Sequence, residues 1–540
     1  METGQERLQA LSDRCGVSVG PMPLSALVAK AAPGLRVKRS AAGAGDFEVD
    51  GTGDLGALAT IGSVRRVHGR GFIQLADTAI VEGFASVPPG SLLRSEPPDG
   101  RPSHVSLMFS NPNANKALHL GHLRQNALGT ALVRLLKTAG LKVTSVSMNG
   151  DWGFHIAQAL VGLGYLDEPA RSQLASGKSD HLAGACIAAY YRELAARPEV
   201  VAEARTLLLR LHARDHSAVA ANQQLTNWAM SGHQETYAVI GSRFDREVFE
   251  SRELPRAEQF VAEGLAAGVF VVRPDGSVGI DLSGQGLWDV TLQRKDGTTT
   301  AFLQHASGWD RVDADLRPDL MLFLIGPDWD APGRAAEMMY ERLGIPWATR
   351  FGTFHHGLVC SDKGRLRSRY GEALIVDAVL ERVRQKLAPP AQHAAAALLK
   401  YTFLRVPRTK NAIFDERRVM GDVLPRFEVI LKASELVRDN EGLAIGGKAL
   451  EGPVRALAFA IDGASRAAFR SLATLDPVVL VRHVDRTAAA IVACEGVRIP
   501  QPIWQHVCVA FNEMLSILNL VQPTDDSFPQ TGDVQELSAT

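Results

Sequence analysis

Residues 110–124 read SNPNANKALHLGHLR, and the rest of the chain is organised around this stretch. It follows a short apolar run, 105–109, that is typical of a buried strand, and it leads into a periodic apolar pattern that predicts a helix. His119 and His122 stand at the expected helix start, beside backbone N–H groups without helical partners and the positive end of the helix dipole. Gly121 lets the backbone approach a ligand closely. The stretch therefore predicts a phosphate-binding turn.

A second stretch, residues 361–371 with the sequence SDKGRLRSRYG, carries the other chemistry expected at a phosphate site. Arg365, Arg367 and Arg369 supply cations next to a glycine, and such a loop would close over a triphosphate and neutralise the leaving pyrophosphate. Lys116 would add a fixed positive charge beside the histidines. A solvated basic loop and an ordinary surface lysine are the alternatives, because cationic side chains are common at surfaces.

The overall composition is that of a globular protein with several domains. At 540 residues the chain is too long for one core, and about two to four domains are expected. The formal net charge of -1 gives no overall basic surface, so contact with a nucleic acid would need a local basic patch. The N-terminal residues do not resemble a signal peptide, and apolar runs such as 320–325 are too short to span a bilayer. The five cysteines show no metal-type spacing, which predicts reduced thiols and a cytoplasmic location.

The order of predicted elements divides the chain into three parts. Residues 1–100 mix a short helix, glycine-rich turns and strands, and end in a linker rich in Pro and Gly. Residues 101–375 begin with a strand, a helix and a second strand, for which a parallel sheet is the natural arrangement, so the predicted fold class is α/β. Within this part, an inserted region of about 166–300 is predicted to be helical and then to contain short strands. Residues 376–540 are predicted to form an all-α bundle with a loose polar tail.

Local patterns give finer expectations. The sheet is expected to resume near Ala301 and again at 320–326. Ligands of doubly wound sheets bind at the carboxyl ends of the strands, so the turns after 105–109 and 142–148 would border one crevice. Helices of the C-terminal part are predicted at 396–404, 425–438, 477–492 and 503–518.

The stretches quoted above are similar to those of arginyl-tRNA synthetases, a family of class I aminoacyl-tRNA synthetases. His119-x-Gly121-His122 stands where that class has its first nucleotide-binding signature, and the preceding Asn-Pro-Asn-x-x-Lys resembles the arginine member. Residues 365–369, RLRSR, fall where the class carries a Lys-Met-Ser-Lys-Ser loop. Further similarities to the family lie at 69–73, 150–153, 243–251, 351–359 and 413–415. The resemblance implies a Rossmann-type catalytic domain with an insertion, a small α+β N-terminal domain of the kind that contacts the tRNA elbow, and a C-terminal bundle of the anticodon-binding kind.

The resemblance also implies ATP-dependent activation of an amino acid as its adenylate, with ATP and Mg²⁺ as cofactors. His119, His122 and Lys116 would act on ATP, and the arginines of the basic loop would act on its phosphates. Further nucleotide contacts are implied for Asn115, Gly121, Leu358, Val359 and Ser368. Asn113 is expected near the amino group of the substrate. The implied partners are an amino acid and a tRNA.

The residues expected around the amino-acid side chain depart from the family. A buried guanidinium needs carboxylates nearby, because an unpaired buried cation is very costly. The acidic residue ahead of the Ser-x-Pro-Asn stretch is Met108 here, and a Tyr-x-x-x-Asp pair is replaced by Phe302 and Ala306. A glutamine of the family becomes Trp329. These changes favour a pocket less suited to arginine; alternatively, the apolar residues are simply core. Polarity could be restored in a different register by His305, Asp328 and Asp330.

The destination of the activated group stays open. Residues 421–427, GDVLPRF, lack the tyrosine of the family's Gly-Asn-x-x-Pro-Tyr segment, which weakens the expectation that the bundle reads an anticodon. The acceptor is a tRNA or, in a tRNA-independent paralogue that forms amides in secondary metabolism, a small amine or peptide. A non-catalytic binding or regulatory homologue is the third alternative. The intact His119-x-Gly121-His122 counts against that alternative, because a dead enzyme is expected to lose such residues.

Overall fold

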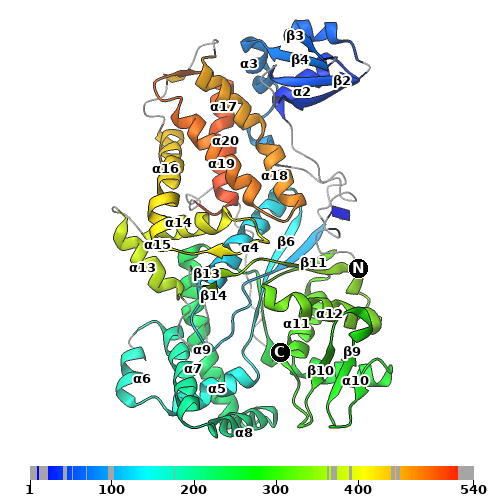
Figure 1. Cartoon of the computed structure of the whole chain (residues 1–540), viewed down its shortest axis with the longest axis vertical. Helices are drawn as coiled ribbons and strands as arrows, with labels where there is room; N and C mark the ends of the chain where they lie inside the picture. Colours follow the sequence, from blue (N-terminus) through cyan, green and yellow to red (C-terminus); the bar gives the residue numbers. More distant parts are fainter. Residues whose placement is uncertain are drawn as a thin grey trace.

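In the computed structural model of the chain, the described residues are 6, 9–10, 22–40, 45–51, 53–68, 70–94, 103–175, 177–361, 364–365, 374–387, 392–439, 444–445 and 450–520. Figure 1 shows a small sheet at one end, a helical bundle next to it, a central sheet, and a second group of helices at the opposite end. The predicted α/β class with a helical C-terminal part is confirmed.

The central sheet is parallel and has the strand order β12-β11-β5-β6-β7. Its strands are β5 (His104–Met108), β6 (Lys142–Asn149), β7 (Arg246–Phe249), β11 (Leu320–Ile325) and β12 (Phe351–His355). Strand β11 is buried along its whole length, as expected for a sheet covered on both faces. The strand order reverses between β5 and β11, and ligands of such sheets bind outside the carboxyl ends of the strands at this point.

Helix α4 (Leu120–Thr138) connects β5 to β6 and confirms the predicted strand, turn and helix. Its apolar residues are buried at helical spacing, among them Leu128 and Leu132. A Cβ atom on Gly129 would lie 2.3 Å from the ring of Phe109, so glycine is needed for this close approach of the helix to the chain after β5. The close packing fixes the position of the first turn of α4 relative to the strand ends.

Residues 166–300 contain helices and short strands, as predicted, but β7 of the central sheet lies within this range, so the region is not a single insertion. Between β6 and β7 lie α5 (Phe154–Gly164), α6 (Glu168–Ala175), α7 (Ser179–Ala196), α8 (Val200–His212) and α9 (His216–Ile240). After β7 come α10 (Leu254–Ala266) and the antiparallel strands β8 (Val271–Val272), β9 (Val278–Asp281) and β10 (Asp289–Gln293). Helices α5 and α7 are in backbone contact, because a Cβ atom on Gly162 would lie 1.9 Å from the carbonyl oxygen of Cys186.

The prediction of a strand near Ala301 is wrong. Residues Ala301–Leu316 form helix α11, whose first turn is capped by the Thr300 hydroxyl, which accepts a hydrogen bond from the N–H of Leu303 at 3.5 Å. The buried Leu303, Ala306, Trp309 and Val312 recur every three residues, which is a helical spacing. Helix α12 (Asp330–Arg342) then connects β11 to β12.

The N-terminal unit is an antiparallel sheet with helices, in the strand order β1-β2-β4-β3. Its elements are α2 (Pro23–Ala31), β1 (Leu35–Arg39), β2 (Phe47–Gly51), β3 (Gly62–Val67), β4 (Arg70–Leu75) and α3 (Asp77–Ala85). Arg455 of the C-terminal bundle joins this unit to the rest of the chain: it donates to the carboxylate of Asp77 at 2.9 Å and to the carbonyl of Leu75 at 2.8 Å.

The C-terminal part is the predicted bundle. Its helices are α13 (Val376–Lys386), α14 (Gln392–Leu404), α15 (Glu416–Arg418), α16 (Leu424–Asp439), α17 (Gly452–Asp462), α18 (Ala464–Ala473), α19 (Val478–Val492) and α20 (Gln501–Ile517). The four helices expected here correspond to α14, α16, α19 and α20. Short strands were not expected in this part: β15 (Ala412–Ile413), β16 (Ala444–Ile445) and β17 (Arg498–Ile499). Strands β13 (Val359–Ser361) and β14 (Gly364–Arg365) precede it. Over the part of the chain that is described, every helix is too short or too polar to cross a membrane.

Candidate active site

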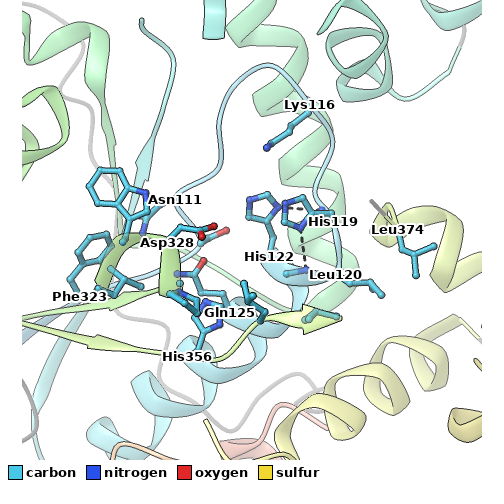
Figure 2. A pocket seen from close by; sticks show the side chains of 18 of the residues that line it. Asn111, Lys116, His119, Leu120, His122, Gln125, Phe323, Asp328, His356 and Leu374 are labelled. Carbon is cyan, nitrogen blue, oxygen red and sulfur yellow. Dashed lines mark hydrogen bonds between the residues drawn. The ribbon is translucent and has the colours of Figure 1, made fainter. Parts of the chain in front are cut away.

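A cavity of about 290 Å³ lies at the carboxyl ends of β5 and β11, where the strand order reverses. Its lining comes from the turn between β5 and α4, the first residues of α4, and the end of β11 with the turn that follows it. Helix α11, His356, Leu358, Val359 and Leu374 complete the lining (Figure 2). The stretch 110–124 therefore lines this crevice, together with Leu358, Val359 and Leu374, which flank the stretch 361–371 in the sequence.

The turn after β5 is strained and firmly held. Ser110 and Asn111 have φ angles of 73° and 46°, a region that residues other than glycine rarely adopt. The Ser110 hydroxyl is hydrogen-bonded to the Tyr237 hydroxyl and accepts from Nδ2 of Asn126, both at 2.8 Å. Oδ1 of Asn111 accepts from the N–H of Met148 at 2.9 Å. Surrounding contacts thus maintain a strained backbone at the cavity, a combination that is common at functional sites.

The two predicted histidines are arranged as a matched pair of hydrogen-bond donors. Nδ1 of His119 accepts from the N–H of Gly121 at 3.1 Å, and Nδ1 of His122 accepts from the N–H of His119 at 3.2 Å. Their rings are stacked, with centroids 4.0 Å apart, as Figure 2 shows. A neutral imidazole that accepts through Nδ1 carries its proton on Nε2. Both rings line the cavity, so they offer Nε2–H donors at the positive end of helix α4.

Burial keeps both histidines neutral. It lowers the pKa of His119 to about 3, and the charge of Lys116 acts in the same direction. The pKa of His122 lies well below 6.5, mainly through burial and further through the neighbouring His119 and Lys116. At physiological pH the proton on each Nε2 therefore stays in place, and the two donors need no protonation event before they bind an anion.

Gly121 lets a ligand approach the backbone closely, and it also leaves room for the ring of His119. A Cβ atom at position 121 would lie 2.9 Å from Cε1 and 3.0 Å from Nδ1 of His119. The ring folds over the glycine, where any larger side chain would displace it. The glycine of His119-x-Gly121-His122 is thus required by the histidine next to it.

We expect Gly121→Ala to separate activity from stability. The helical backbone accepts alanine, so the stability should change by at most about 1 kcal/mol, whereas the ring of His119 must move and its Nε2–H would miss its target. The ATP-dependent activation that the resemblance implies should fall about tenfold or more. The measurement is the thermal unfolding midpoint together with ATP–pyrophosphate exchange. Gly452→Ala is the matched control, because Gly452 also begins a helix and a Cβ atom there would meet nothing within 4 Å.

Lys116 and the two predicted asparagines have different surroundings. Lys116 lines the cavity beside the histidines (Figure 2). Asn115 donates through Nδ2 to the carbonyl of His155 at 3.1 Å, and Asn113 forms an isolated parallel bridge with Gly150. Neither asparagine is among the described residues that line the cavity. Asn113 thus joins the turn after β5 to the end of β6, and Asn115 joins it to the first turn of α5.

Three residues expected around the amino-acid side chain lie in the core instead of the cavity lining. Sδ of Met108 accepts a hydrogen bond from Nε1 of Trp309 at 3.1 Å, and Ala306 is buried beside it. Phe302 packs partly buried on the same hydrophobic cluster. The departures from the family pattern at these positions are therefore accommodated by apolar packing.

The other two residues expected there, Asp328 and Trp329, do line the cavity, together with Phe323 and His305. His305 contacts the Trp329 ring with centroids 4.6 Å apart, and its Nδ1 lies 3.0 Å from Oε1 of the buried Glu250. The carboxylate Glu250 was not singled out from the sequence. It comes from the segment after β7, and no local pattern marks it as a neighbour of α11.

Two residues just before the predicted basic loop also reach the cavity. Leu358 and Val359 line it, and strand β14 pairs Arg365 with Cys360 of β13. The remaining positions predicted in this loop lie outside the described residues: Arg367, Ser368 and Arg369.

Both ends of that loop are bonded to the beginning of α4. Arg124 donates to the carbonyls of Gly357 and Leu358 at 2.8 and 3.0 Å, just before the loop. After the loop, the carbonyl of Leu374 accepts from the N–H of Leu120 at 3.0 Å. These bonds hold the loop ends at the histidine pair, although the two stretches are far apart in the sequence.

Several lining residues were missed by sequence reasoning. Gln125 lies one helical turn after His122 and donates to the carbonyl of Leu324 at 2.6 Å, and this spacing could have identified it. His356 and Leu374 also line the cavity, and only the fold brings them there.

One group of possible metal ligands occurs among the described residues, away from the cavity. Asp180, His181 and Asp377 have their ligand atoms within 4.8 Å of one another. Nζ of Lys178 donates to Asp377 at 2.7 Å and to Asp180 at 3.2 Å, so an ammonium already compensates these carboxylates. The cluster joins α7 to α13 and serves the fold.

We expect stability to rise with pH between about pH 4 and pH 6.5, because buried histidines must become charged on acid unfolding. Burial lowers the pKa of several histidines to about 3 or 4: His119, His233, His356 and His483. Between those values and 6.5 the unfolded chain binds more protons than the folded chain, so the free energy of unfolding increases with pH. Asp151 and Asp462, whose pKa values burial raises to about 6, act in the opposite direction but are fewer.

The measurement is the thermal unfolding midpoint at about pH 4.5 and about pH 7, at constant ionic strength. A lower midpoint at the acidic pH is expected. An equal or higher midpoint there would contradict the assignment of these histidines as buried and neutral.

Residues 97–392 match the model of the family described as tRNA synthetases class I (R), catalytic domain. The arginine–tRNA ligase of Amoebophilus asiaticus (strain 5a2) is 30% identical over 346 residues, which cover 58% of this chain and 58% of that protein. That of Treponema denticola is 29% identical over 370 residues, or 63% of each. The matched segment thus spans less than two thirds of these relatives.

Solved structures share the fold over a greater length. The arginyl-tRNA synthetase of Thermus thermophilus superposes with a TM-score of 0.66 at 19% identity, covering 95% of this chain and 98% of that one. The arginyl-tRNA synthetase of Plasmodium falciparum gives a TM-score of 0.66 at 11% identity, covering 92% and 96%. The likeness in architecture therefore includes the N-terminal sheet and the C-terminal bundle as well as the central sheet.

Proposed function

The chain belongs to the class I tRNA synthetases of the arginyl type, and from this premise we propose that it is a ligase that activates an amino acid with ATP. The product would be an aminoacyl adenylate, with release of pyrophosphate. The observation that carries the proposal is the pair of neutral Nε2–H donors of His119 and His122 at the N-terminus of α4, inside the cavity.

The reaction needs positioning and charge stabilisation more than it needs an acid or a base. A carboxylate oxygen of the amino acid attacks the α-phosphorus of ATP, and the bond from that phosphorus to the bridging oxygen of pyrophosphate breaks. Negative charge grows on the phosphate oxygens, and preorganised N–H donors stabilise it without rearranging. His119, His122 and the first backbone N–H groups of α4 would supply these donors, and Lys116 would add a positive charge.

The leaving pyrophosphate is assigned to the basic loop. Arg365, Arg367 and Arg369 would bind its oxygens with planar guanidinium groups, which are suited to bidentate contacts. Leu358 and Val359 would contact the nucleotide base from the cavity wall. Mg²⁺ neutralises triphosphate charge when bound, and it is commonly held by phosphate oxygens with one or two carboxylates. Asp328 is the carboxylate in the described cavity lining that would hold it, so the donor set fits.

The acceptor is proposed to be a tRNA, as the printed names of the relatives suggest for those proteins. Its terminal hydroxyl would attack the acyl carbon of the adenylate and release AMP. A second candidate acceptor is a small amine or peptide, in which case the product is an amide. The segment 421–427, without the family's tyrosine, favours this second candidate.

ATP–pyrophosphate exchange with a panel of amino acids, in the presence and absence of tRNA, tests the proposal. Exchange that depends on one amino acid or a small group is expected. Absence of exchange with every amino acid and tRNA combination would refute the activity and favour the non-catalytic alternative.

The acceptor needs its own measurement. Transfer of radiolabelled amino acid to tRNA, with a gel shift at several salt concentrations, would support the tRNA partner, because phosphate contacts weaken steeply with salt. Adenylate formation without either signal would favour the small amine or peptide.

A further inference from the structure

One carboxylate–imidazole pair is buried at the wall of the cavity. Nδ1 of His305 lies 3.0 Å from Oε1 of Glu250, and the two residues are each 5% exposed. A carboxylate accepts hydrogen bonds, so the Nδ1–H of His305 donates to it. Removal of His305 would leave the buried charge of Glu250 without compensation, which is strongly destabilising. The pair is therefore a fixed part of the wall.

The second ring nitrogen of His305 is left unsatisfied by the described part of the protein. Nε2 is buried and has no hydrogen-bond partner among the described residues, and His305 belongs to the cavity lining. The ring orientation is held on both sides, by Trp329 at 4.6 Å and by Phe323 at 5.4 Å between centroids. Buried polar atoms in native structures are normally satisfied, so a buried nitrogen at a cavity wall indicates the position of a substrate group.

The chemistry of Nε2 limits what that group can be. With Nδ1 donating to Glu250, Nε2 accepts a hydrogen bond when the ring is neutral and donates one when the ring is charged. A hydroxyl or a carboxamide can satisfy both forms. A guanidinium or an ammonium only donates, so it satisfies the neutral ring but not the charged ring, in which Nε2 also donates. A carboxylate only accepts, and it would face the charge of Glu250.

The neighbouring wall suits the carbon part of such a side chain. Phe323, Ile325 and Trp329 line the cavity next to His305, so the methylene groups of a substrate would be desolvated against apolar surfaces. The wall thus combines an apolar surface with one oriented polar atom, which is the usual composition of a small-molecule site.

We propose that His305 reads the side chain of the substrate amino acid, and that this substrate carries a neutral hydroxyl or carboxamide group that binds Nε2 of His305. The inference rests on the proposed adenylate-forming function. Glu250 positions the imidazole, and Trp329 and Phe323 fix its plane.

Amino-acid-dependent ATP–pyrophosphate exchange by the full chain tests the inference directly. The panel contains arginine, lysine, aspartate, glutamate and the hydroxyl- and carboxamide-bearing amino acids. A hydroxyl or carboxamide amino acid should have a kcat/KM at least about tenfold above that of arginine. A preference for arginine or lysine would overturn this inference and leave the proposed function standing. Absence of exchange with every amino acid would overturn the proposed function, and this inference with it.

Two isosteric variants then test the role of the ring. In His305→Asn the side-chain amide can still donate to Glu250 but leaves the Nε2 position empty, whereas His305→Gln places an amide nitrogen near that position. We expect His305→Asn to raise the KM for the preferred amino acid about 10- to 100-fold with the KM for ATP unchanged, and His305→Gln to recover part of the loss. An equal rise in both KM values, or no rise in either, would overturn the assignment.

The matched control is His355→Asn. His355 also faces a carboxylate, with Nδ1 3.5 Å from Asp330, but it is exposed and outside the described cavity lining. This variant should keep both KM values. The thermal unfolding midpoint of each variant is compared with that of the unmodified chain.

Discussion

Replacing His122 by alanine is expected to lower ATP–pyrophosphate exchange by about 10²- to 10³-fold while the fold is retained, because one preorganised donor to the developing phosphate charge is lost. The ring does two things at once. Its Nδ1 accepts from the N–H of His119, which fixes the turn, and its Nε2–H faces the cavity. Burial keeps the pKa of His122 well below 6.5, so the donor is the neutral ring throughout the physiological range.

Variants that replace only one of the two ring nitrogens of His122 separate the contribution of Nδ1 to the turn from that of Nε2–H to the cavity. His122→Asn can still accept from the N–H of His119 but has no group at the Nε2 position, so its exchange should fall as far as that of His122→Ala. His122→Gln places an amide near the Nε2 position and should retain more activity. Exchange equal to that of the unmodified chain in His122→Ala would refute the catalytic role.

The control for the His122 series is His216→Ala. His216 also stands at the first turn of a helix, α9, but it is exposed and is not among the described residues lining the cavity. Its replacement should leave exchange and stability unchanged. A loss there comparable to that of His122→Ala would mean that the measured effect is general to helix termini.

The histidine pair could be predicted because all of its determinants are local. The strand, the turn and the first helical turn lie within residues 104–138, and the spacing of His119 and His122 puts both on the same end of one helix. The partner of each Nδ1 is a backbone N–H within three residues. Such contacts follow from the helix start itself and need no knowledge of the tertiary fold.

The amino-acid side of the cavity could not be predicted, because its residues come together only through long-range packing. The alternation of side chains along a strand predicts that Met108 faces one side of the sheet. It does not predict that Trp309 of α11 covers that side. Glu250 and His305 meet although they are 55 positions apart in the sequence. Asp328 and Trp329, which the resemblance placed at the substrate, line the cavity, whereas the side chains of Met108, Phe302 and Ala306 lie in the core.

Arg124 offers the second large effect, and it lies in the same helix as the histidines. Its guanidinium is fully buried and donates to backbone carbonyls on two separated segments. The acceptors are the carbonyls of Gly357, Leu358, Pro407, Arg408 and Lys410, at 2.6 to 3.2 Å. Burial lowers the pKa of Arg124 to about 10, which leaves the group charged at neutral pH. One side chain thus holds two segments against α4: residues 357–358, just before the basic loop, and residues 407–410, which follow α14 of the C-terminal bundle.

Arg124→Met is expected to destabilise the protein by about 3–5 kcal/mol, because several buried carbonyls lose their donor at once. Because Leu358 is both an acceptor of Arg124 and part of the cavity lining, the KM for ATP should rise as well. Urea unfolding midpoints and ATP-dependent exchange measure the two effects. Arg124→Lys should recover only a part of the stability, since an ammonium has three donors in place of five.

The two effects of Arg124 can be told apart from general damage to helix α4. Lys137→Met, at an exposed position of the same helix, removes a cation without removing a buried contact and should change neither measurement. If Arg124→Met kept the unfolding midpoint and the KM for ATP of the unmodified chain, the guanidinium would not be the link between the loop, the bundle and the histidine turn. If it lost stability but kept the KM for ATP, the loop start would be positioned by β13 and its pairing with β15 alone. A loss of both is expected, because the same donor contacts the segment that lines the cavity and the segment that supports it.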